Sequence, residues 1–194
     1  MTQASEDDER RLASAGERWF ALHVRSNCEN LVLAHLRERG YAEFCPSFTT
    51  TRQWSDRKKV IRRFLFPGYI FCRLDLRDRL PVLKLPGVIG FVGSRNQPTP
   101  IPDGEIASVR TMAESGLGAK PWPFLSAGQT ILIERGPLAG LEGILQQEKN
   151  TWCLVVTVQL LKRSISVQID RSWVRPVTAR RLRWHLAPEP RLSP

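Results

Sequence analysis

The segment 128-GQTILIERGPLAGLEGILQQ-147 decides the fold of the second half of this 194-residue chain. Apolar and polar residues alternate in QTILIE, which is typical of a strand with one buried face, and ILQQ begins a second strand. Between them lie residues suited to a turn and to close backbone approach: Gly136, Pro137, Gly140 and Gly143. No Gly-Lys-Ser/Thr sequence follows and the flanking elements are strands. The segment is therefore neither a phosphate-binding loop nor a dinucleotide-binding motif.

Further short strands follow this turn, TWCLVVTVQL at 151–160 and SISVQID at 164–170. About 50 residues of short strands with Gly-rich turns predict a small all-β barrel over residues 128–177. The β-branched side chains in both runs favour strands over helix. We therefore expect a stable barrel, joined flexibly to the rest of the chain.

The first half of the chain mixes strands and helices. WFALHVR at 19–25 alternates as a strand does, and SNCENLVLAHLRERG at 26–40 has the pattern of a helix. Ser26 and Glu29 have the spacing of a capping box, and Gly40 supplies the stop. Two strands joined by a basic connection follow, and then a helix that Asp103 can cap. This order predicts an α+β domain over residues 17–114, with helices covering a mainly antiparallel sheet.

Three segments lie outside these two domains. Residues 115–127 concentrate Gly, Pro and Ser and predict a linker. The acidic residues 1–16 predict a disordered tail, and residues 178–194 form a basic tail. No apolar run is long enough to span a bilayer and the first residues lack the pattern of a signal peptide. We expect a cytoplasmic monomer that makes no membrane contact.

The formal net charge of +10 favours a polyanionic partner such as nucleic acid. Basic residues concentrate between Arg52 and Arg63, where Asp56 is the single acid. A solvated basic surface that only aids solubility is the alternative. The cysteines form no C-x-x-C pair, and no histidine lies at ligand spacing from a cysteine, so we expect neither a metal site nor a cofactor.

Aromatic residues crowd around a Pro-Gly pair in FLFPGYIFCRL at 64–74. A normal central strand does not contain proline, because proline lacks the N–H that the ladder requires. We predict that Phe64, Ile70 and Phe71 belong to the core. Phe66 and Tyr69 are expected at the surface, as part of a protein interface. The alternative is that all the aromatic side chains here belong to the core.

Four segments in series resemble known protein modules. The turn segment at 128–147 resembles a KOW motif, which occurs in ribosomal proteins and transcription elongation factors. WFALHVRSNCENLVLAHLRERGY, FLFPGYIFCRL and LPGVIGFVG resemble the opening strand and helix, the Phe-Pro-Gly-Tyr strand and the Pro-Gly-Val segment of the NusG N-terminal domain. Over residues 18–177 the chain resembles the NusG family of transcription factors, in particular a specialised paralog of the NusG/RfaH type.

This resemblance implies that the N-terminal domain binds the clamp of RNA polymerase through an apolar surface, bridges the DNA cleft and modulates pausing or termination. The implied polymerase-binding residues are Phe66, Pro67, Gly68, Tyr69, Trp19 and Tyr41. Non-template or upstream DNA, or nascent RNA, would meet a basic set: Arg25, Asn27, Arg52, Trp54, Arg57, Lys58, Lys59, Arg62 and Arg63. Trp54 could stack on a base, whereas the charges would supply affinity without reading sequence.

The barrel departs from the resembled family at its partner face. General factors of the family carry Phe-Gly-Arg after the third barrel strand, where this chain has Leu161, Lys162 and Arg163. Only Arg163 matches, which puts contacts with termination factor Rho and a ribosomal protein in doubt and favours a factor for selected operons. Some relatives hold this region as a helical hairpin against the polymerase-binding face. The β-branched runs argue against a hairpin here.

The sequence offers no convincing catalytic group. Ser26 is close to His23 in sequence, but strand alternation gives the two side chains no reason to meet, and no carboxylate pair stands out. We therefore expect a binding factor and no enzyme. Two functions remain: an elongation or antitermination factor that acts on RNA polymerase, and an RNA- or ribosome-binding KOW protein. The LFPGY strand favours the first.

Overall fold

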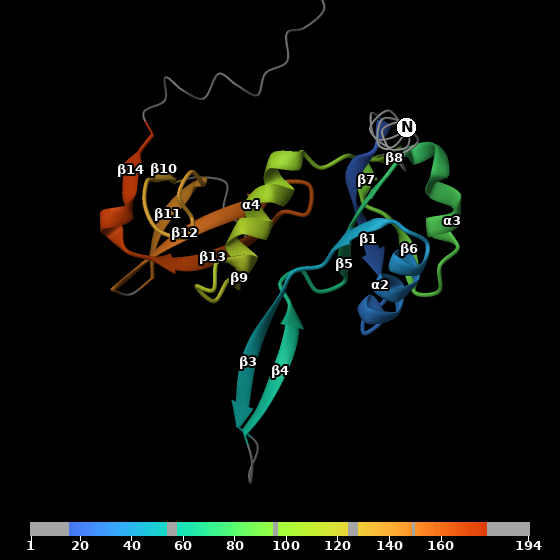
Figure 1. Cartoon of the computed structure of the whole chain (residues 1–194), viewed down its shortest axis with the longest axis horizontal. Helices are drawn as coiled ribbons and strands as arrows, with labels where there is room; N and C mark the ends of the chain where they lie inside the picture. Colours follow the sequence, from blue (N-terminus) through green and yellow to red (C-terminus); the bar gives the residue numbers. More distant parts are fainter. Residues whose placement is uncertain (1–15, 54–57, 95–96, 124–127, 149, 178–194) are drawn as a thin grey trace, which may run out of the picture.

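Two antiparallel sheets, with helix α4 between them, organise the computed structural model of the chain (Figure 1). The structure describes residues 16–53, 58–94, 97–123, 128–148 and 150–177. The mixed first half and the all-β second half confirm the predicted fold class. Within the described residues, no helix is long and apolar enough to cross a membrane.

The first sheet has the strand order β2-β5-β1-β6. Its strands and helices are β1 (Arg18–Val24), α2 (Glu29–Glu38), β2 (Ala42–Phe44), β5 (Tyr69–Leu74), the 3-10 turn η2 (Leu76–Asp78), α3 (Arg79–Leu83), β6 (Val88–Phe91) and α4 (Asp103–Glu114). Central strand β1 pairs antiparallel with both β5 and β6 and is buried on both faces. Phe20 and Leu22 pack in a cluster with Val32 and Leu36 of α2. Ala21 points to the opposite side, toward α4.

The two long helices begin where the sequence predicts, but without the predicted side-chain caps. Cys28 precedes α2 and makes no capping hydrogen bond with its side chain. Glu29 is buried, and its Oε1 accepts a hydrogen bond from the Gly68 N–H at 3.1 Å. The capping box between Ser26 and Glu29 is therefore wrong, because the carboxylate binds a distant turn. Pro102, not Asp103, occupies the N-cap position of α4.

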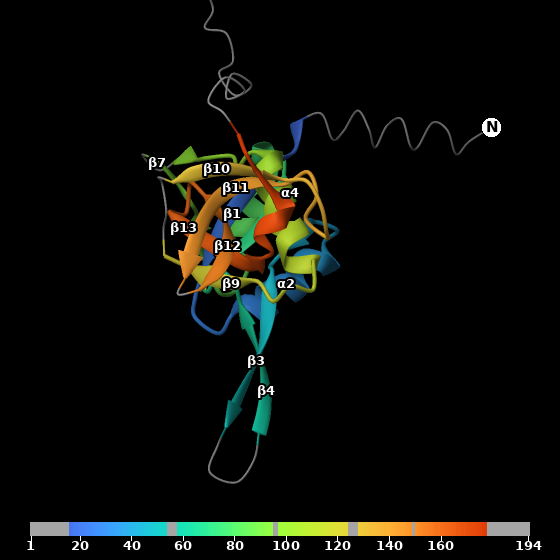
Figure 2. The ribbon, with the colours of Figure 1, turned by 90° about the vertical axis from the view of Figure 1, so that its left-hand side faces the viewer.

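A two-stranded hairpin, β3 (Ser47–Gln53) and β4 (Lys58–Phe64), projects from the body of the molecule (Figures 1 and 2). Its register runs from Ser47 opposite Phe64 to Gln53 opposite Lys58. The sequence predicts two strands over this segment, whereas the structure has four, β2 to β5. Most of the predicted basic connection is strand, because residues 52–53 and 58–63 lie in the hairpin. Strands β7 (Gly93–Ser94) and β8 (Gln97–Pro98) form a second, shorter pair.

The second sheet has the order β14-β10-β11-β12-β13-β9. Its elements are β9 (Lys120–Trp122), β10 (Gln129–Ile133), β11 (Glu142–Glu148), β12 (Thr151–Val158), β13 (Arg163–Ile169), the 3-10 turn η3 (Arg171–Trp173) and β14 (Val174–Pro176). All of its pairs are antiparallel. Strand β9 comes from the segment that the sequence predicts as a linker.

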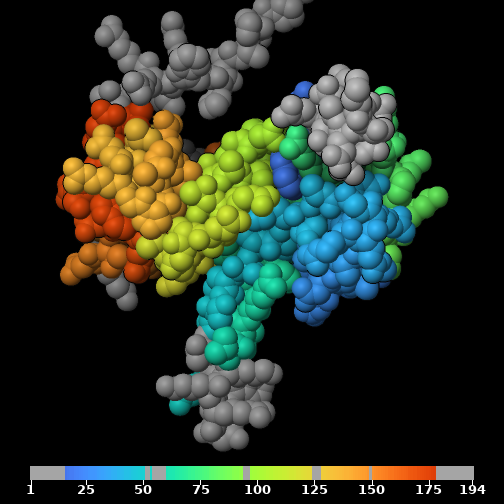
Figure 3. Space-filling view, viewed as in Figure 1, coloured from blue at the N-terminus to red at the C-terminus, as the bar shows by residue number. Residues whose placement is uncertain are grey.

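The barrel packs directly on the first half of the chain, so the expected flexible attachment is wrong in this structure. One hydrophobic cluster, which we call the shared cluster, contains Ile106, Val109 and Met112 of α4 together with residues of both sheets. From the barrel it includes Val156 and Ile165. The space-filling view shows α4 lying against both halves (Figure 3). The apolar residues of this helix pack against both halves of the chain. Separating the barrel from the first half would expose these residues to water, which is unfavourable.

A substitution at Gly143 tests how closely the backbone of β11 approaches β12 inside the barrel. A Cβ added there would lie 2.8 Å from the Val155 carbonyl oxygen and 2.7 Å from Leu154 Cδ1. Gly143→Ala should therefore lower the free energy of unfolding of the barrel by about 1–3 kcal/mol, as overpacking does. Gly104→Ala is the matched control, because its added Cβ would meet no atom within 4 Å other than its chain neighbours and the backbone of its own helix. Urea unfolding measures both, and equal stability of the two variants would contradict the tight contact.

Candidate functional site

The Pro67-Gly68 turn between β4 and β5 is fixed by three hydrogen bonds. The Tyr69 N–H donates to the Phe66 carbonyl at 3.1 Å, and the Gly68 carbonyl accepts from Val24 N–H at 2.9 Å. Glu29 supplies the third bond, from α2 to the Gly68 N–H. Gly68 has φ of +81°, a conformation that favours glycine. The turn therefore presents exposed Pro67 at a defined position on the sheet.

Phe66 is 1% exposed, so its expected place at the surface is wrong in this structure. Its ring packs edge-on against Phe71, with centroids 5.4 Å apart, and Phe71 stacks on Phe44 at 5.9 Å. The shared cluster covers all three rings. Ile70 and Phe71 are buried as predicted, whereas Phe64 is half-buried. Phe66 is therefore part of the shared cluster and not of the surface.

Tyr69 stays partly exposed and lies between two other side chains. On the neighbouring strand, His23 is its register partner, and the two rings stack at 5.4 Å with an interplanar angle of 23°. The guanidinium carbon of Arg163, on β13 of the barrel, lies 5.2 Å from the centre of the Tyr69 ring. This is the geometry of a cation–π contact. A residue predicted to bind polymerase thus contacts a residue predicted to bind a partner of the barrel.

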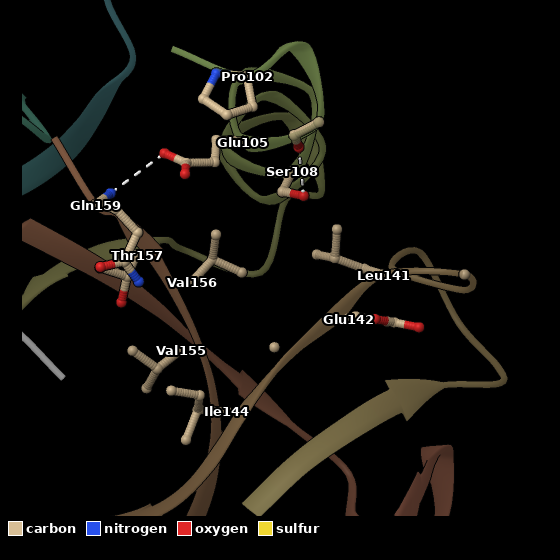
Figure 4. A pocket seen from close by; sticks show the side chains of 13 residues that line it. Pro102, Glu105, Ser108, Leu141, Glu142, Ile144, Val155, Val156, Thr157 and Gln159 are labelled. Carbon is tan, nitrogen blue, oxygen red and sulfur yellow. Dashed lines mark hydrogen bonds between the residues drawn. The ribbon is translucent and has the colours of Figure 1, made fainter. Parts of the chain in front are cut away.

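A second polar contact joins the two halves of the chain. The Gln159 N–H of the barrel donates to Glu105 Oε2 of α4 at 3.2 Å (Figure 4). Burial raises the pKa of Glu105, and the hydrogen bond partly opposes that shift. A cavity of about 710 Å³ lies beside this contact, with walls from α4 and from the barrel residues Leu141, Ile144 and Val156.

Trp19 and Tyr41 do not lie beside Tyr69. Trp19 is 8% exposed and opposes Arg73 at the far end of β5. Tyr41 immediately precedes β2, whose Ala42 also opposes Arg73, and it packs against the cluster under α2. Burial raises the pKa of the Tyr41 hydroxyl. The structure therefore brings together Phe66, Pro67, Gly68 and Tyr69 but separates them from the other two predicted residues.

The partner-face residues of the barrel lie at the start of β13. Lys162 has φ of +47° in the turn that precedes the strand, and Leu161 is half-buried against the shared cluster. Arg163 is exposed apart from its contact with Tyr69. Of the predicted turn residues, Gly136 and Gly140 both have positive φ. Gly136 lies against the Trp173 ring.

The predicted nucleic-acid set follows the hairpin and its base. Arg62 Nε donates to Ser47 Oγ at 2.6 Å, and Arg63 is exposed. These two arginines and Asn27 line a cavity of about 460 Å³ with Phe48 and Pro67. Arg25 is exposed at the end of β1 and Asn27 has φ of +64°.

Part of this predicted set cannot be placed. The backbones of Arg52, Lys58 and Lys59 lie in the hairpin strands, but their side chains fall outside what the structure describes. Trp54 and Arg57 lie outside the described residues altogether, as do residues 1–15 of the predicted N-terminal tail, 1–16, and the whole predicted tail at 178–194. The described part of the chain has no group of three or more His, Cys, Asp or Glu side chains placed to hold a metal ion.

Sequence reasoning missed three residues that matter to this site: His23, Glu29 and Glu105. His23 is exposed, and its stack on Tyr69 follows directly from the β1–β5 register. Glu29 and Glu105 act through contacts distant in sequence, with Gly68 and Gln159. No local pattern signals such contacts.

Glu29→Ala tests how firmly α2 fixes the Pro67-Gly68 turn. The variant leaves a part-buried N–H without its acceptor, which should cost about 1–3 kcal/mol of unfolding free energy. Glu38→Ala, on the exposed end of the same helix, is the control and should change stability by less than about 0.5 kcal/mol. Chemical denaturation of both variants makes the comparison, and an equal loss from both would show that the Glu29 contact does not stabilise the turn.

Glu105 predicts a pH dependence of the contact between the two halves. Because burial raises its pKa above the ordinary value, the folded arrangement favours the protonated acid. Protonated Glu105 therefore adds to the free energy of unfolding at low pH. This stabilisation is lost as the pH rises through the raised pKa of Glu105. In a titration followed by NMR, the Gln159 amide signal should shift with a midpoint above 4.5. Glu105→Gln should abolish the shift. A midpoint at or below 4.5 would contradict the burial of this carboxylate.

Comparison with known proteins identifies the relatives of this chain. The family model described as "Transcription termination factor nusG" matches residues 17–110. The "Transcription termination/antitermination protein NusG" of Pseudomonas aeruginosa is 29% identical over 177 residues, which cover 83% of this chain and 99% of the relative. The proteins of the same description from Helicobacter pylori and Staphylococcus epidermidis are 26% and 28% identical. These matches cover 82% and 79% of this chain, and 98% and 92% of the relatives.

A solved structure titled "Domain interaction in Thermotoga maritima NusG" is 23% identical, with a TM-score of 0.49, and the match covers 85% of this chain and 99% of that chain. The family match spans β1 to α4, including the Pro67-Gly68 turn, and the relatives extend the similarity across the barrel. This chain is therefore similar to NusG proteins: residues 17–110 match the family model, and the curated relatives match most of the chain.

Proposed function

We propose that this protein is a transcription elongation and antitermination factor that binds RNA polymerase and modulates pausing or termination. The observation that carries the proposal is the fixed Pro67-Gly68 turn, with Tyr69 beside it, on a domain that matches the NusG family model. Relatives similar over most of their length are named transcription termination/antitermination proteins. The protein acts in the cytoplasm as a monomer, without a cofactor.

The polymerase-binding surface is centred on Pro67, Gly68 and Tyr69, with the clamp of the enzyme as the partner. Pro67 is exposed and Tyr69 is half-buried, so both can contribute to an interface core once the Tyr69 ring is uncovered. Phe66 supports this surface from beneath, because its buried ring packs on Phe71. Trp19 and Tyr41 contribute only through the stability of the sheet.

Arg163 limits this binding in the arrangement described. Its guanidinium covers the Tyr69 ring, and the barrel around it shares a hydrophobic cluster with α4. Polymerase must therefore compete with the barrel for the same tyrosine. Displacement of the barrel frees Arg163 at the same moment, so that binding at one surface makes the other available.

Nucleic acid binds along the hairpin and its base, where Arg62, Arg63 and Arg25 are exposed. The contacts supply electrostatic affinity for non-template or upstream DNA, or for nascent RNA, and they do not read bases. The partner face at Leu161, Lys162 and Arg163 serves a narrower set of targets than a general factor does. Contact with Rho or with a ribosomal protein would use this face.

Two substitutions with opposite expected effects test the polymerase-binding surface. Tyr69→Ala should weaken binding to core RNA polymerase by about tenfold or more, because an aromatic anchor is lost. Arg163→Ala should strengthen binding by about 2- to 5-fold, because the competing cation–π contact is worth about 0.5–1 kcal/mol. Quantitative pull-down with purified core enzyme makes both measurements.

Arg175→Ala is the matched control for the barrel, since Arg175 is exposed and pairs with Glu134 at 2.7 Å. It should bind polymerase as the unchanged protein does. If Tyr69→Ala binds equally well, the assignment of the surface is wrong. If Arg163→Ala matches the control, the barrel does not compete for Tyr69. If the unchanged protein does not bind polymerase at all, an RNA- or ribosome-binding function replaces the proposal.

A further inference from the structure

The cavity of about 710 Å³ beside the contact between Glu105 and Gln159 has one wall from each half of the chain (Figure 4). The first turns of α4 form one wall, and residues of the barrel, mainly from β11 and β12, form the other. The apolar residues that line it are Pro102, Leu141, Ile144, Val155 and Val156. A segment bound in this space, which we call the α4–barrel cavity, would contact both halves of the chain at once.

Among the described residues, the two charged ones that line the α4–barrel cavity are both acidic. Glu105 comes from α4, and Glu142, which is exposed, begins β11. The chain as a whole has a formal net charge of +10, so the charge of this cavity is opposite in sign to the net charge of the protein. Apolar walls next to carboxylates favour an occupant that combines apolar side chains with positive charges.

The sequence 180-RRLRWHL-186, in the basic tail, has this combination of side chains. Its apolar residues are Leu182, Trp184 and Leu186, and they alternate with Arg181, Arg183 and His185. Successive side chains of an extended segment point to opposite faces, so this alternation gives one apolar face and one basic face. Glu189 is the single acid among residues 178–194. The tail is therefore complementary to the α4–barrel cavity in both polarity and charge.

The described part of the chain ends close to this cavity. The Val177 N–H donates to the Thr130 carbonyl at 3.0 Å, and Thr130 is the register partner of Ile144, which lines the cavity. Neighbouring strands lie about 4.8 Å apart, so Val177 is about 10 Å from Ile144. An extended chain advances about 3.3 Å per residue, so about three residues after Val177 cover this distance. The sequence that begins at Arg180 is therefore within reach.

We propose that residues 180–186 bind in the α4–barrel cavity as an extended segment of the same chain. Leu182, Trp184 and Leu186 lie against the apolar walls, and the arginines lie toward Glu142. In this position the segment contacts α4 and the barrel together, so it strengthens the contact that the shared cluster already makes between the two halves. Its arginines are then engaged and unavailable to nucleic acid. The binding depends on the cavity and not on the proposed function.

A fluorescent peptide of residues 178–194 is the probe for this cavity. In the unchanged full chain the tethered tail competes with the peptide at a high effective concentration. A neutral-tail variant of the full chain, which removes this competition, carries Arg180→Gln, Arg181→Gln, Arg183→Gln and Trp184→Ala. None of these residues lies in a helix or strand that the structure describes. In fluorescence anisotropy, the peptide should bind the neutral-tail variant at least tenfold more tightly than the unchanged chain.

Two lysine substitutions in the neutral-tail variant show where the peptide binds. Glu142→Lys should weaken peptide binding at least fivefold, because it replaces an attraction by a repulsion. Glu148→Lys is the matched control: it makes the same charge change at the other end of β11, away from the cavity, and should change affinity by less than twofold. Circular dichroism checks that each variant is folded. Equal affinity of the peptide for the neutral-tail variant and the unchanged chain would overturn the proposal, as would equal effects of the two lysine substitutions. Polymerase pull-down reports separately on the surface at Tyr69.

Discussion

The burial of α4 on two sides is the constraint on which this structure depends. Ile106, Val109 and Met112 are each at most 2% exposed, in a cluster that contains side chains of both sheets. A fully buried residue of this kind contributes about 1.5–3 kcal/mol relative to an exposed one. A helix that covered only the first sheet would leave part of this surface in water. Packing of the barrel therefore follows from the same helix that completes the N-terminal domain.

This arrangement places the two candidate interfaces against each other. Tyr69 reaches the seam because the Pro67-Gly68 turn is tied to α2 and β1, and Arg163 reaches it because β13 packs beside α4. A cation–π contact at a partly exposed site is weak, so an external partner can replace it. The shared hydrophobic cluster holds the barrel against the first half more strongly than this cation–π contact does. In the proposed function, docking at Tyr69 depends on how often the barrel separates from α4, and the contact between Tyr69 and Arg163 makes this separation slightly less frequent.

Much of the fold could be predicted from local patterns. Alternation in β1 and in the barrel, the turn around Gly136 and Pro137, and the start of α4 all depend on short-range spacing, and the structure contains each of them. Phe66 could not be placed, because it is buried in a cluster whose members come from distant parts of the sequence. Ser26 and Glu29 had the right spacing for a capping box, but Gly68 competes successfully for the carboxylate.

The candidate site was predictable only as a list of residue types. The Phe-Pro-Gly-Tyr segment indicated the turn on which the candidate site is built. The contacts of Tyr69 with His23 and Arg163 follow from strand register and from the packing of the barrel, which the segment itself does not reveal. Strand β9 was likewise not predicted, because the Gly, Pro and Ser content of its segment is typical of a linker. A three-residue strand with a central proline is recognisable only by its pairing with β13.

The most direct test of this account is ¹⁵N relaxation of the full chain in solution. If α4 holds both sheets, amides in β1 and β12 should report one common rotational correlation time, that of a single body. A shorter correlation time for β10 to β14 than for β1 and β5 would show that the barrel moves independently, and would contradict the shared cluster as the basis of the structure.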